Sequence, residues 1–262
     1  MSRLILAVCF ALACGKPAAE APVAPPAPVV EQAAAGPAWI DEPSSGLRAL
    51  VFPPVAPPAP LVIALHGLGD RPEAFHRLLD SSAAVVNLHV PAAPQAHGRG
   101  FSWFPVRASP DDAVLAVAVK AAADQVARYI GAVRKPSQKV VVTGFSQGGM
   151  LSFALAAHHP EVVDLSVPIG GFLPVGLRVA GSSTPSPVFA LHGAADERIA
   201  VGGAQDSVAW LDAQGGQATL RTWAGVGHTI SAEMRQVVTT LVETADPAQV
   251  PASGAVGGAG PG

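Results

Sequence analysis

Cysteine is scarce in this sequence: Cys9 and Cys14 are the only two, and both stand near the N-terminus. The rest of the chain therefore has no internal disulfide and no cysteine-based metal site. Charge is sparse as well, because Asp, Glu, Lys and Arg make up 13% of the 262 residues and the formal net charge is −3. This balance argues against a basic nucleic-acid binder and against a highly charged disordered chain.

Long hydrophobic runs are missing too. Half of the residues are hydrophobic, yet no apolar run reaches the roughly 20 residues that a membrane-spanning helix needs. The length suits one domain of about 200 residues with tails. No repeat or break in composition divides residues 44–245, so these residues are predicted to form a single domain.

The first residues are typical of an export signal. Arg3 precedes an apolar stretch over 4–13, which ends in Ala-Leu-Ala directly before Cys14. This pattern predicts a signal peptide over 1–13, and Ala-Leu-Ala-Cys resembles a bacterial lipobox in which Cys14 carries the lipid. Plain secretion and an uncleaved hydrophobic start are the alternatives. We expect an exported protein, either a lipoprotein of the bacterial cell envelope or a secreted protein.

Two segments have too little sequence variety to build a core. Residues 14–43 are rich in Pro and Ala, which predicts a semi-rigid tether. Residues 246–262 consist mainly of Gly, Ala and Pro, which predicts a disordered tail.

The body between these segments alternates strand and helix patterns. Short apolar or β-branched runs predict strands over 48–52, 61–65, 85–90, 139–143, 165–169, 187–191 and 218–223. Longer stretches predict helices over 110–133, 201–213 and 231–244. This alternation predicts an α/β fold, a mostly parallel sheet with helices on both faces.

The strongest motif is Gly-Phe-Ser-Gln-Gly over 144–148, at a predicted strand-to-helix turn. Gly-x-Ser-x-Gly in that context is typical of the nucleophile elbow of α/β-hydrolases. The tight turn exposes the hydroxyl of Ser146 above the sheet, and the flanking glycines have no Cβ to obstruct it. Ser146 is therefore the candidate nucleophile.

A serine nucleophile needs a base, and the base needs an orienting carboxylate, in the chain order Ser, Asp or Glu, His. Asp196 follows the predicted strand 187–191 and is the candidate carboxylate, and the neighbouring Glu197 is expected to be a surface charge. His228 lies in a glycine-rich loop after strand 218–223 and is the candidate base. His158 and His159 are expected to cap a helix, and His192 to be structural.

Two backbone N–H groups are needed to stabilise the oxyanion of an acyl-transfer reaction. The residue after the nucleophile, Gln147, supplies one. The loop His-Gly-Leu-Gly-Asp over 66–70 follows strand 61–65, and Leu68 is the expected second donor. Gly67 and Gly69 would let the backbone of this loop approach a substrate closely.

Taken together, the motifs at 66–70, 144–150, 192–196 and 225–228 resemble those of the phospholipase/carboxylesterase family of α/β-hydrolases, which includes acyl-protein thioesterases and small bacterial carboxylesterases. Pro-Ala-Ala-Pro at 91–94 and Ser-Trp-Phe at 102–104 also match segments of that family. The resemblance covers about residues 45–243. It implies an α/β-hydrolase fold without a large cap domain, a triad of Ser146, Asp196 and His228, and a substrate pocket lined by Trp103.

The resemblance further implies a hydrolase without a cofactor, acting on carboxylic esters and in some members on thioesters or lysophospholipids. We expect a small-molecule or lipid-like ester as the substrate, no nucleic-acid partner, contact with a membrane only through the N-terminal lipid, and a monomer or homodimer. No metal is expected, because the histidines do not cluster with carboxylates at ligand spacing. The alternatives are an exported esterase of feruloyl or acetyl groups on polysaccharides, a peptidase, and an inactive binding lipoprotein on a hydrolase fold.

Overall fold

The computed structural model describes residues 36–105, 112–179, 181 and 183–251. The chain divides into two compact units, 1–34 and 35–262, and the fold described below belongs to the second. The predicted signal peptide, the candidate lipidation residue Cys14 and most of the predicted tether lie outside the described residues.

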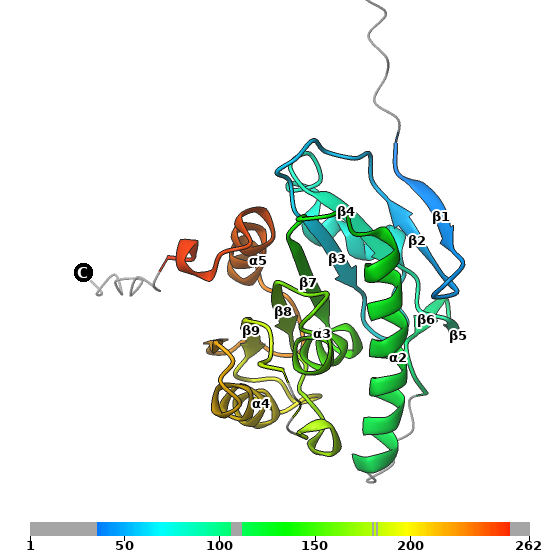
Figure 1. The fold of residues 1–262 in the computed structure, drawn as a ribbon. Coiled ribbons are helices and arrows are strands. Elements are labelled where there is room, and N and C mark those ends of the chain that lie inside the picture. The colour runs from blue at the N-terminus through cyan, green and yellow to red at the C-terminus, as the bar shows by residue number, and fades with distance from the viewer. Residues whose placement is uncertain (1–35, 106–111, 180, 182, 252–262) are drawn as a thin grey trace, which may run out of the picture. The chain divides into compact units, whose positions relative to one another are not determined.

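An eight-stranded sheet forms the centre of the second unit (Figure 1). Its strand order is β1-β2-β4-β3-β7-β8-β9-β10; β1, β2 and β4 pair antiparallel, and all other neighbours pair parallel. The strands are β1 (Ala38–Glu42), β2 (Leu47–Val51), β3 (Leu61–Leu65), β4 (Asn87–Pro91), β7 (Val140–Phe145), β8 (Leu165–Ile169), β9 (Val188–Gly193) and β10 (Ala218–Trp223). Strands β3 and β8 are buried along their whole length, as expected of apolar runs covered on both faces.

Helices cover both faces of this sheet, and each face has its own hydrophobic core. On one face pack α2 (Asp112–Val133), α3 (Gln147–His158), α4 (Val201–Ala213) and the 3-10 helix η2 (Val175–Leu177). On the other pack α1 (Pro72–Phe75), the 3-10 helix η1 (His76–Leu79) and α5 (Ala232–Thr244). The predicted α/β fold with helices on both faces is confirmed, and the described residues form no separate cap domain.

Local sequence accounts for the best-matched elements. The predicted strands 61–65, 165–169 and 218–223 and the helix 201–213 coincide with β3, β8, β10 and α4. Helix α5 begins one residue later than predicted because Ser231 is its N-cap, with its Oγ accepting a hydrogen bond from the Met234 amide at 3.2 Å. None of the helices in the described part of the chain is both long and apolar enough to cross a bilayer.

The boundaries predicted for the domain need correction at both ends. Residues 38–42, assigned to the tether, form β1, which pairs antiparallel with β2 at the edge of the sheet. Residues 247–249, assigned to a disordered tail, form the 3-10 helix η3 (Pro247–Gln249), whose N-cap Asp246 accepts a hydrogen bond from Ala248 at 2.9 Å. β1 depends on its pairing with β2, and η3 depends on its cap at Asp246; composition alone reveals neither contact.

A small hairpin was not predicted. Strands β5 (Gln95–His97) and β6 (Gly100–Ser102) form a two-stranded sheet that lies against the loop after β3. Phe101 exchanges backbone hydrogen bonds with that loop, accepting from Gly69 at 2.8 Å and donating to Asp70 at 3.0 Å. Gly100 allows this contact, because a Cβ there would overlap the backbone oxygens of the loop.

Candidate active site

The turn between β7 and α3 holds Ser146 in a strained conformation. Its φ is +57° and its ψ is −112°, values that a residue with a side chain adopts only when its surroundings enforce them. The Ser146 amide donates to the carbonyl of Ile169 at 2.9 Å, and its own carbonyl accepts from Met150 at 3.0 Å. These contacts hold the turn in the geometry of a nucleophile elbow.

Three glycines let α3 begin so close to the sheet. A Cβ on Gly144 would lie 2.5 Å from the carbonyl oxygen of Gly148, and one on Gly149 would lie 2.6 Å from that of Ile169. A Cβ on Gly148 would overlap the carbonyl oxygen of Leu65. Glycine is therefore required by close packing at each of these positions, as the motif suggested for Gly144 and Gly148.

The structure brings the three predicted triad residues together. The hydroxyl of Ser146 lies 3.0 Å from Nε2 of His228, and Nδ1 of His228 lies 2.7 Å from Oδ2 of Asp196. With an ionised carboxylate accepting from Nδ1–H, Nε2 of the neutral ring is left as the acceptor for the Ser146 hydroxyl. This is the tautomer that a general base requires.

Asp196 is buried at the end of β9 and is held on both oxygens. Oδ1 accepts hydrogen bonds from the amides of Arg198 and Ile199, each at 2.9 Å, while Oδ2 faces His228. Burial by itself would raise the pKa of Asp196, but the hydrogen bonds from Ile199, His228 and Arg198 outweigh it and hold the pKa below its usual value. The carboxyl group is therefore ionised at neutral pH. Glu197 is exposed.

The loop that carries His228 packs closely onto the end of β9. A Cβ on Gly193 would lie 2.5 Å from the carbonyl oxygen of Gly227, and Ala195 donates to the carbonyl of Val226 at 2.9 Å. The ring of Phe145 lies 4.8 Å from that of His228 between centroids. This contact was not predicted from the sequence, although Phe145 stands at the x position directly before Ser146 in the Gly-x-Ser-x-Gly motif.

The other histidines have different surroundings. His192 is buried beside the triad, with Nε2 2.8 Å from the carbonyl of Ile199 and 3.4 Å from Oδ2 of Asp196. His158 contacts the carbonyl of Leu177, and His159 follows α3 and contacts the Asp124 carboxylate. The position of His192 agrees with the structural role expected of it. The side chains of His158 and His159 do not cap α3, because they contact groups outside it; the C-cap is the backbone N–H of His159, which donates to the carbonyl of Leu155.

The two predicted oxyanion donors come from the residue after Ser146 and from the loop after β3. Gln147 is the first residue of α3, so its amide belongs to the unpaired N–H groups at a helix N-terminus. Leu68 lies in the loop after β3, which approaches so closely that a Cβ on Gly67 would be 3.5 Å from the Cβ of Ser146. Among the described residues, neither amide donates a hydrogen bond to another backbone group outside the regular elements.

Trp103 corrects one expectation. It was expected to line the substrate pocket, but its side chain is 2% exposed and belongs to the hydrophobic core beside α2 and α3. Its indole Nε1 donates to the carbonyl of His66 at 2.9 Å. Trp103 is therefore a buried residue hydrogen-bonded to the loop predicted to supply an oxyanion donor.

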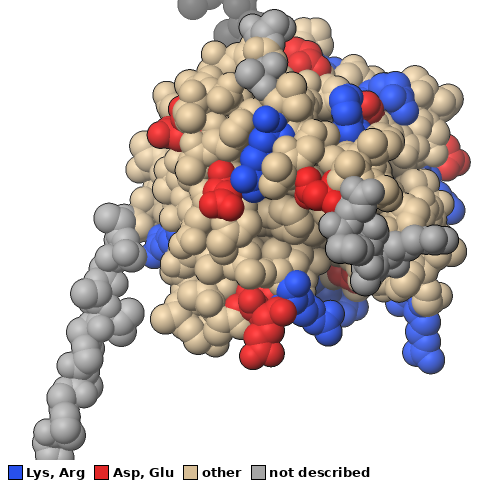
Figure 2. All heavy atoms as spheres, turned by 90° about the horizontal axis from the view of Figure 1, so that it is seen from below, with Lys and Arg blue, Asp and Glu red and all other residues tan. Residues whose placement is uncertain are grey.

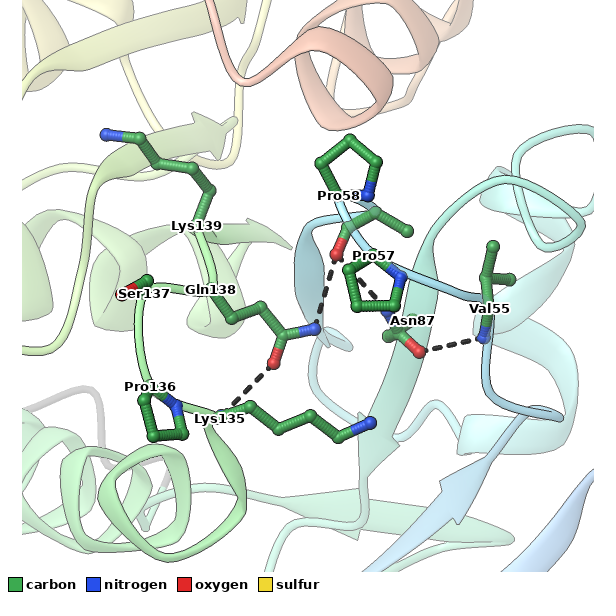
Figure 3. A pocket seen from close by; sticks show the side chains of 10 residues that line it. Val55, Pro57, Pro58, Asn87, Lys135, Pro136, Ser137, Gln138 and Lys139 are labelled. Atoms are coloured by element: carbon green, nitrogen blue, oxygen red, sulfur yellow. Dashed lines mark hydrogen bonds between the residues drawn. The ribbon is translucent and has the colours of Figure 1, made fainter.

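A cavity of about 280 Å³ lies away from the triad, beside the residues that precede β3 and β7 (Figure 3). Its polar groups already pair with one another. Asn87 Oδ1 accepts from the Val55 amide at 2.9 Å, and the side chains of Asn87 and Gln138 both donate to the carbonyl of Ala59. The hydrogen-bonding groups of this cavity thus brace neighbouring loops.

No group of three or more His, Cys, Asp or Glu side chains within the described ranges is arranged to hold a metal ion.

The fold and this geometry define an α/β-hydrolase. The sequence profile of the phospholipase/carboxylesterase family matches residues 48–245. The chain belongs to the phospholipase/carboxylesterase family.

Individual relatives agree with this placement. A probable carboxylesterase of Oryza sativa subsp. japonica is 29% identical over 217 residues, covering 73% of this chain and 81% of the relative. A second rice protein, named a probable inactive carboxylesterase, is 30% identical over 191 residues, covering 64% and 78%. The crystal structure of esterase PE8 is similar with a TM-score of 0.66 at 25% identity, covering 75% of this chain and 97% of that one.

Proposed function

We propose that this protein is a serine hydrolase that cleaves carboxylic esters through an acyl-enzyme on Ser146. The observation that carries the proposal is the continuous hydrogen-bond chain from Ser146 through His228 to Asp196, with distances of 3.0 and 2.7 Å. Such a chain raises the nucleophilicity of a serine hydroxyl by giving its proton an acceptor.

The reaction proceeds in two halves. The Oγ of Ser146 attacks the acyl carbonyl carbon while its proton passes to Nε2 of His228, and the resulting oxyanion accepts hydrogen bonds from the Leu68 and Gln147 amides. The imidazolium then gives the proton to the leaving oxygen, and the acyl group stays on Ser146. Water attacks this ester next, with its proton passing to His228, and the carboxylic acid leaves as Ser146 recovers its proton. Asp196 stays ionised throughout and stabilises the imidazolium.

The sparse charge on the protein surface favours a substrate with an uncharged acyl group. Figure 2 views the molecule from the side where α2 begins, and charged side chains there are scattered among a majority of uncharged residues. The side chain of Leu68, next to the proposed oxyanion donor, is 37% exposed. We infer that esters with an uncharged acyl group are preferred. Thioesters are further candidates for the same chemistry, and so are lysophospholipids, whose charge lies on the headgroup and not on the acyl chain.

The test uses the purified full-length chain and p-nitrophenyl esters with acyl chains from C2 to C16. We expect turnover with an initial burst of p-nitrophenol, loss of turnover in Ser146→Ala, and covalent labelling of Ser146 by a fluorophosphonate. The exposed Ser44→Ala is the matched control and should keep full activity. If folded protein neither turns over any ester nor reacts with the fluorophosphonate, the inactive binding protein becomes the better description. Labelling without turnover would point to polymer-bound esters.

A further inference from the structure

The side chain of Gln147 points into the protein, away from the expected position of a substrate. Its Oε1 accepts hydrogen bonds from the Trp103 amide at 3.0 Å and the Ser102 hydroxyl at 3.3 Å, and its Nε2 donates to the carbonyl of Phe104 at 3.0 Å. Gln147 is 5% exposed. The residue that offers a backbone amide to the oxyanion therefore uses its side chain to hold residues 102–104.

Trp103 continues this connection to the other side of the site. Its indole Nε1 donates to the carbonyl of His66 at 2.9 Å, and the rings of the two residues lie 5.4 Å apart between centroids. His66 is fully buried, and burial lowers the pKa of its imidazole, which keeps the ring neutral. Its Nε2 accepts from the Ala93 amide at 3.1 Å, so the ring proton lies on Nδ1.

That proton is directed at the proposed oxyanion loop. Nδ1 of His66 donates to the carbonyl oxygen of Gly67 at 2.7 Å. The carbonyl of Gly67 and the N–H of Leu68 belong to the same peptide unit, which is planar. A hydrogen bond that fixes the oxygen therefore also fixes the direction in which the Leu68 N–H points.

We propose that His66, Trp103 and Gln147 form a positioning network that fixes the Leu68 amide relative to the Gln147 amide. The inference rests on the proposed function, because it assigns these side chains the task of preorganising the two oxyanion donors. Donors that are already aligned need no reorganisation when charge develops on the substrate oxygen. None of the three side chains touches the reacting atoms, so they act only through the two amides.

The clearest perturbation is Trp103→Phe, which keeps the aromatic packing and removes the indole N–H. Gln147→Met is the second variant, because it keeps the length of the side chain and removes its three hydrogen bonds. His66→Asn retains a donor near the position of Nδ1, whereas His66→Leu removes it. Trp210→Phe in α4 is the matched control. Active sites are counted by fluorophosphonate titration, so that loss of folded protein is not read as loss of rate.

We expect Trp103→Phe and Gln147→Met to lower kcat on p-nitrophenyl acetate by about 10-fold to 100-fold, because small misplacements of preorganised groups have effects of this size. KM should change by less than about threefold, whereas affinity for a boronic acid, which forms a tetrahedral adduct on Ser146, should fall in parallel with kcat. The pH profile of kcat/KM should keep its shape, because His228 and Asp196 are untouched. The double variant should lose about as much as the worse single variant, because both act in one network. His66→Asn should retain more activity than His66→Leu.

The inference is overturned if kcat per active site and boronic acid affinity stay within about threefold of wild type in both Trp103→Phe and Gln147→Met. A shifted pH profile also overturns it, because the effect would then lie on His228. Ser146→Ala separates this failure from that of the proposed function. If Ser146→Ala is inactive while the network variants are fully active, only the positioning network fails, whereas turnover retained in Ser146→Ala removes both.

Discussion

Replacing Asp196 by Asn tests how the hydrogen bonds around His228 set its tautomer. Asn has nearly the same shape as Asp, but one oxygen becomes an NH₂ group. In the native structure Oδ1 accepts from two backbone amides at 2.9 Å, while Oδ2 accepts from His228 at 2.7 Å. The amide oxygen of Asn should keep the two backbone donors, because the reverse orientation would set an NH₂ group against two N–H groups.

That orientation turns the NH₂ group towards Nδ1 of His228, which must then accept a hydrogen bond. The ring proton moves to Nε2, 3.0 Å from the Ser146 hydroxyl, so the imidazole can no longer take the serine proton. The same exchange in serine proteases with a Ser-His-Asp triad lowers kcat by about 10⁴-fold, so we expect a loss of about 10³-fold to 10⁴-fold here. This corresponds to about 4–5.5 kcal/mol in the barrier.

The assay is steady-state hydrolysis of p-nitrophenyl acetate at neutral pH, with folding checked by circular dichroism. Glu197→Gln is the matched control, because Glu197 is an exposed carboxylate next to Asp196, and it should keep nearly full activity. A loss of less than tenfold in a folded Asp196→Asn protein would refute the assignment of Asp196 as the residue that fixes the tautomer.

Three further predictions follow from local features. The pKa of Asp196 is lower in the folded protein than in the unfolded chain, where it is about 3.9. The ionised carboxylate therefore stabilises the folded state above a pH of about 3.9, and this contribution is lost as the pH falls through the pKa of the folded state. In urea titrations, the difference in unfolding free energy between wild type and Asp196→Asn should therefore shrink between pH 5 and pH 3, and a constant difference would contradict this. Gly148→Ala should destabilise the fold by about 3 kcal/mol or more, because the added Cβ overlaps the Leu65 carbonyl. Its control, Gly131→Ala on the exposed surface of α2, should stabilise the fold by about 0.5–1 kcal/mol. Equal urea unfolding midpoints for the two variants would show that the close packing at Gly148 is misjudged. In a bacterial host, radiolabelled palmitate should be incorporated into the wild-type protein and not into Cys14→Ser, and equal labelling of the two would exclude lipidation at that residue.

Part of this structure followed directly from local sequence patterns. β3 and β8 were predictable because a short apolar run with no polar face fits a strand buried on both sides. The strand predicted over 85–90 was displaced, because β4 runs from Asn87 to Pro91 and Val85 is 49% exposed in the preceding turn. β1, β5 and β6 escaped prediction because they are short, β1 and β5 are largely exposed, and all three exist through pairing with other segments.

Part of the candidate site could also be predicted from local sequence patterns, and part could not. The strained turn at Ser146 could be predicted because the glycines around it serve contacts that only a residue without a Cβ permits. The order of Ser146, Asp196 and His228 along the chain made them candidates. However, His228 is 82 residues from Ser146 and 32 residues from Asp196, and separation in sequence does not predict distance in space. Only the parallel arrangement of β7, β9 and β10, which brings the carboxyl ends of the strands to one edge, sets these side chains in contact.

The class of fold, the elbow and the chemical types of the reacting groups could thus be predicted from the sequence, because each depends on patterns within a few residues. Folding in three dimensions was needed to bring His228 into contact with Ser146 and to place Trp103 in the core. It also turned the side chain of Gln147 inwards to hold residues 102–104. Side-chain direction depends on neighbours that are distant in sequence, and no local pattern records where those neighbours lie once the chain has folded.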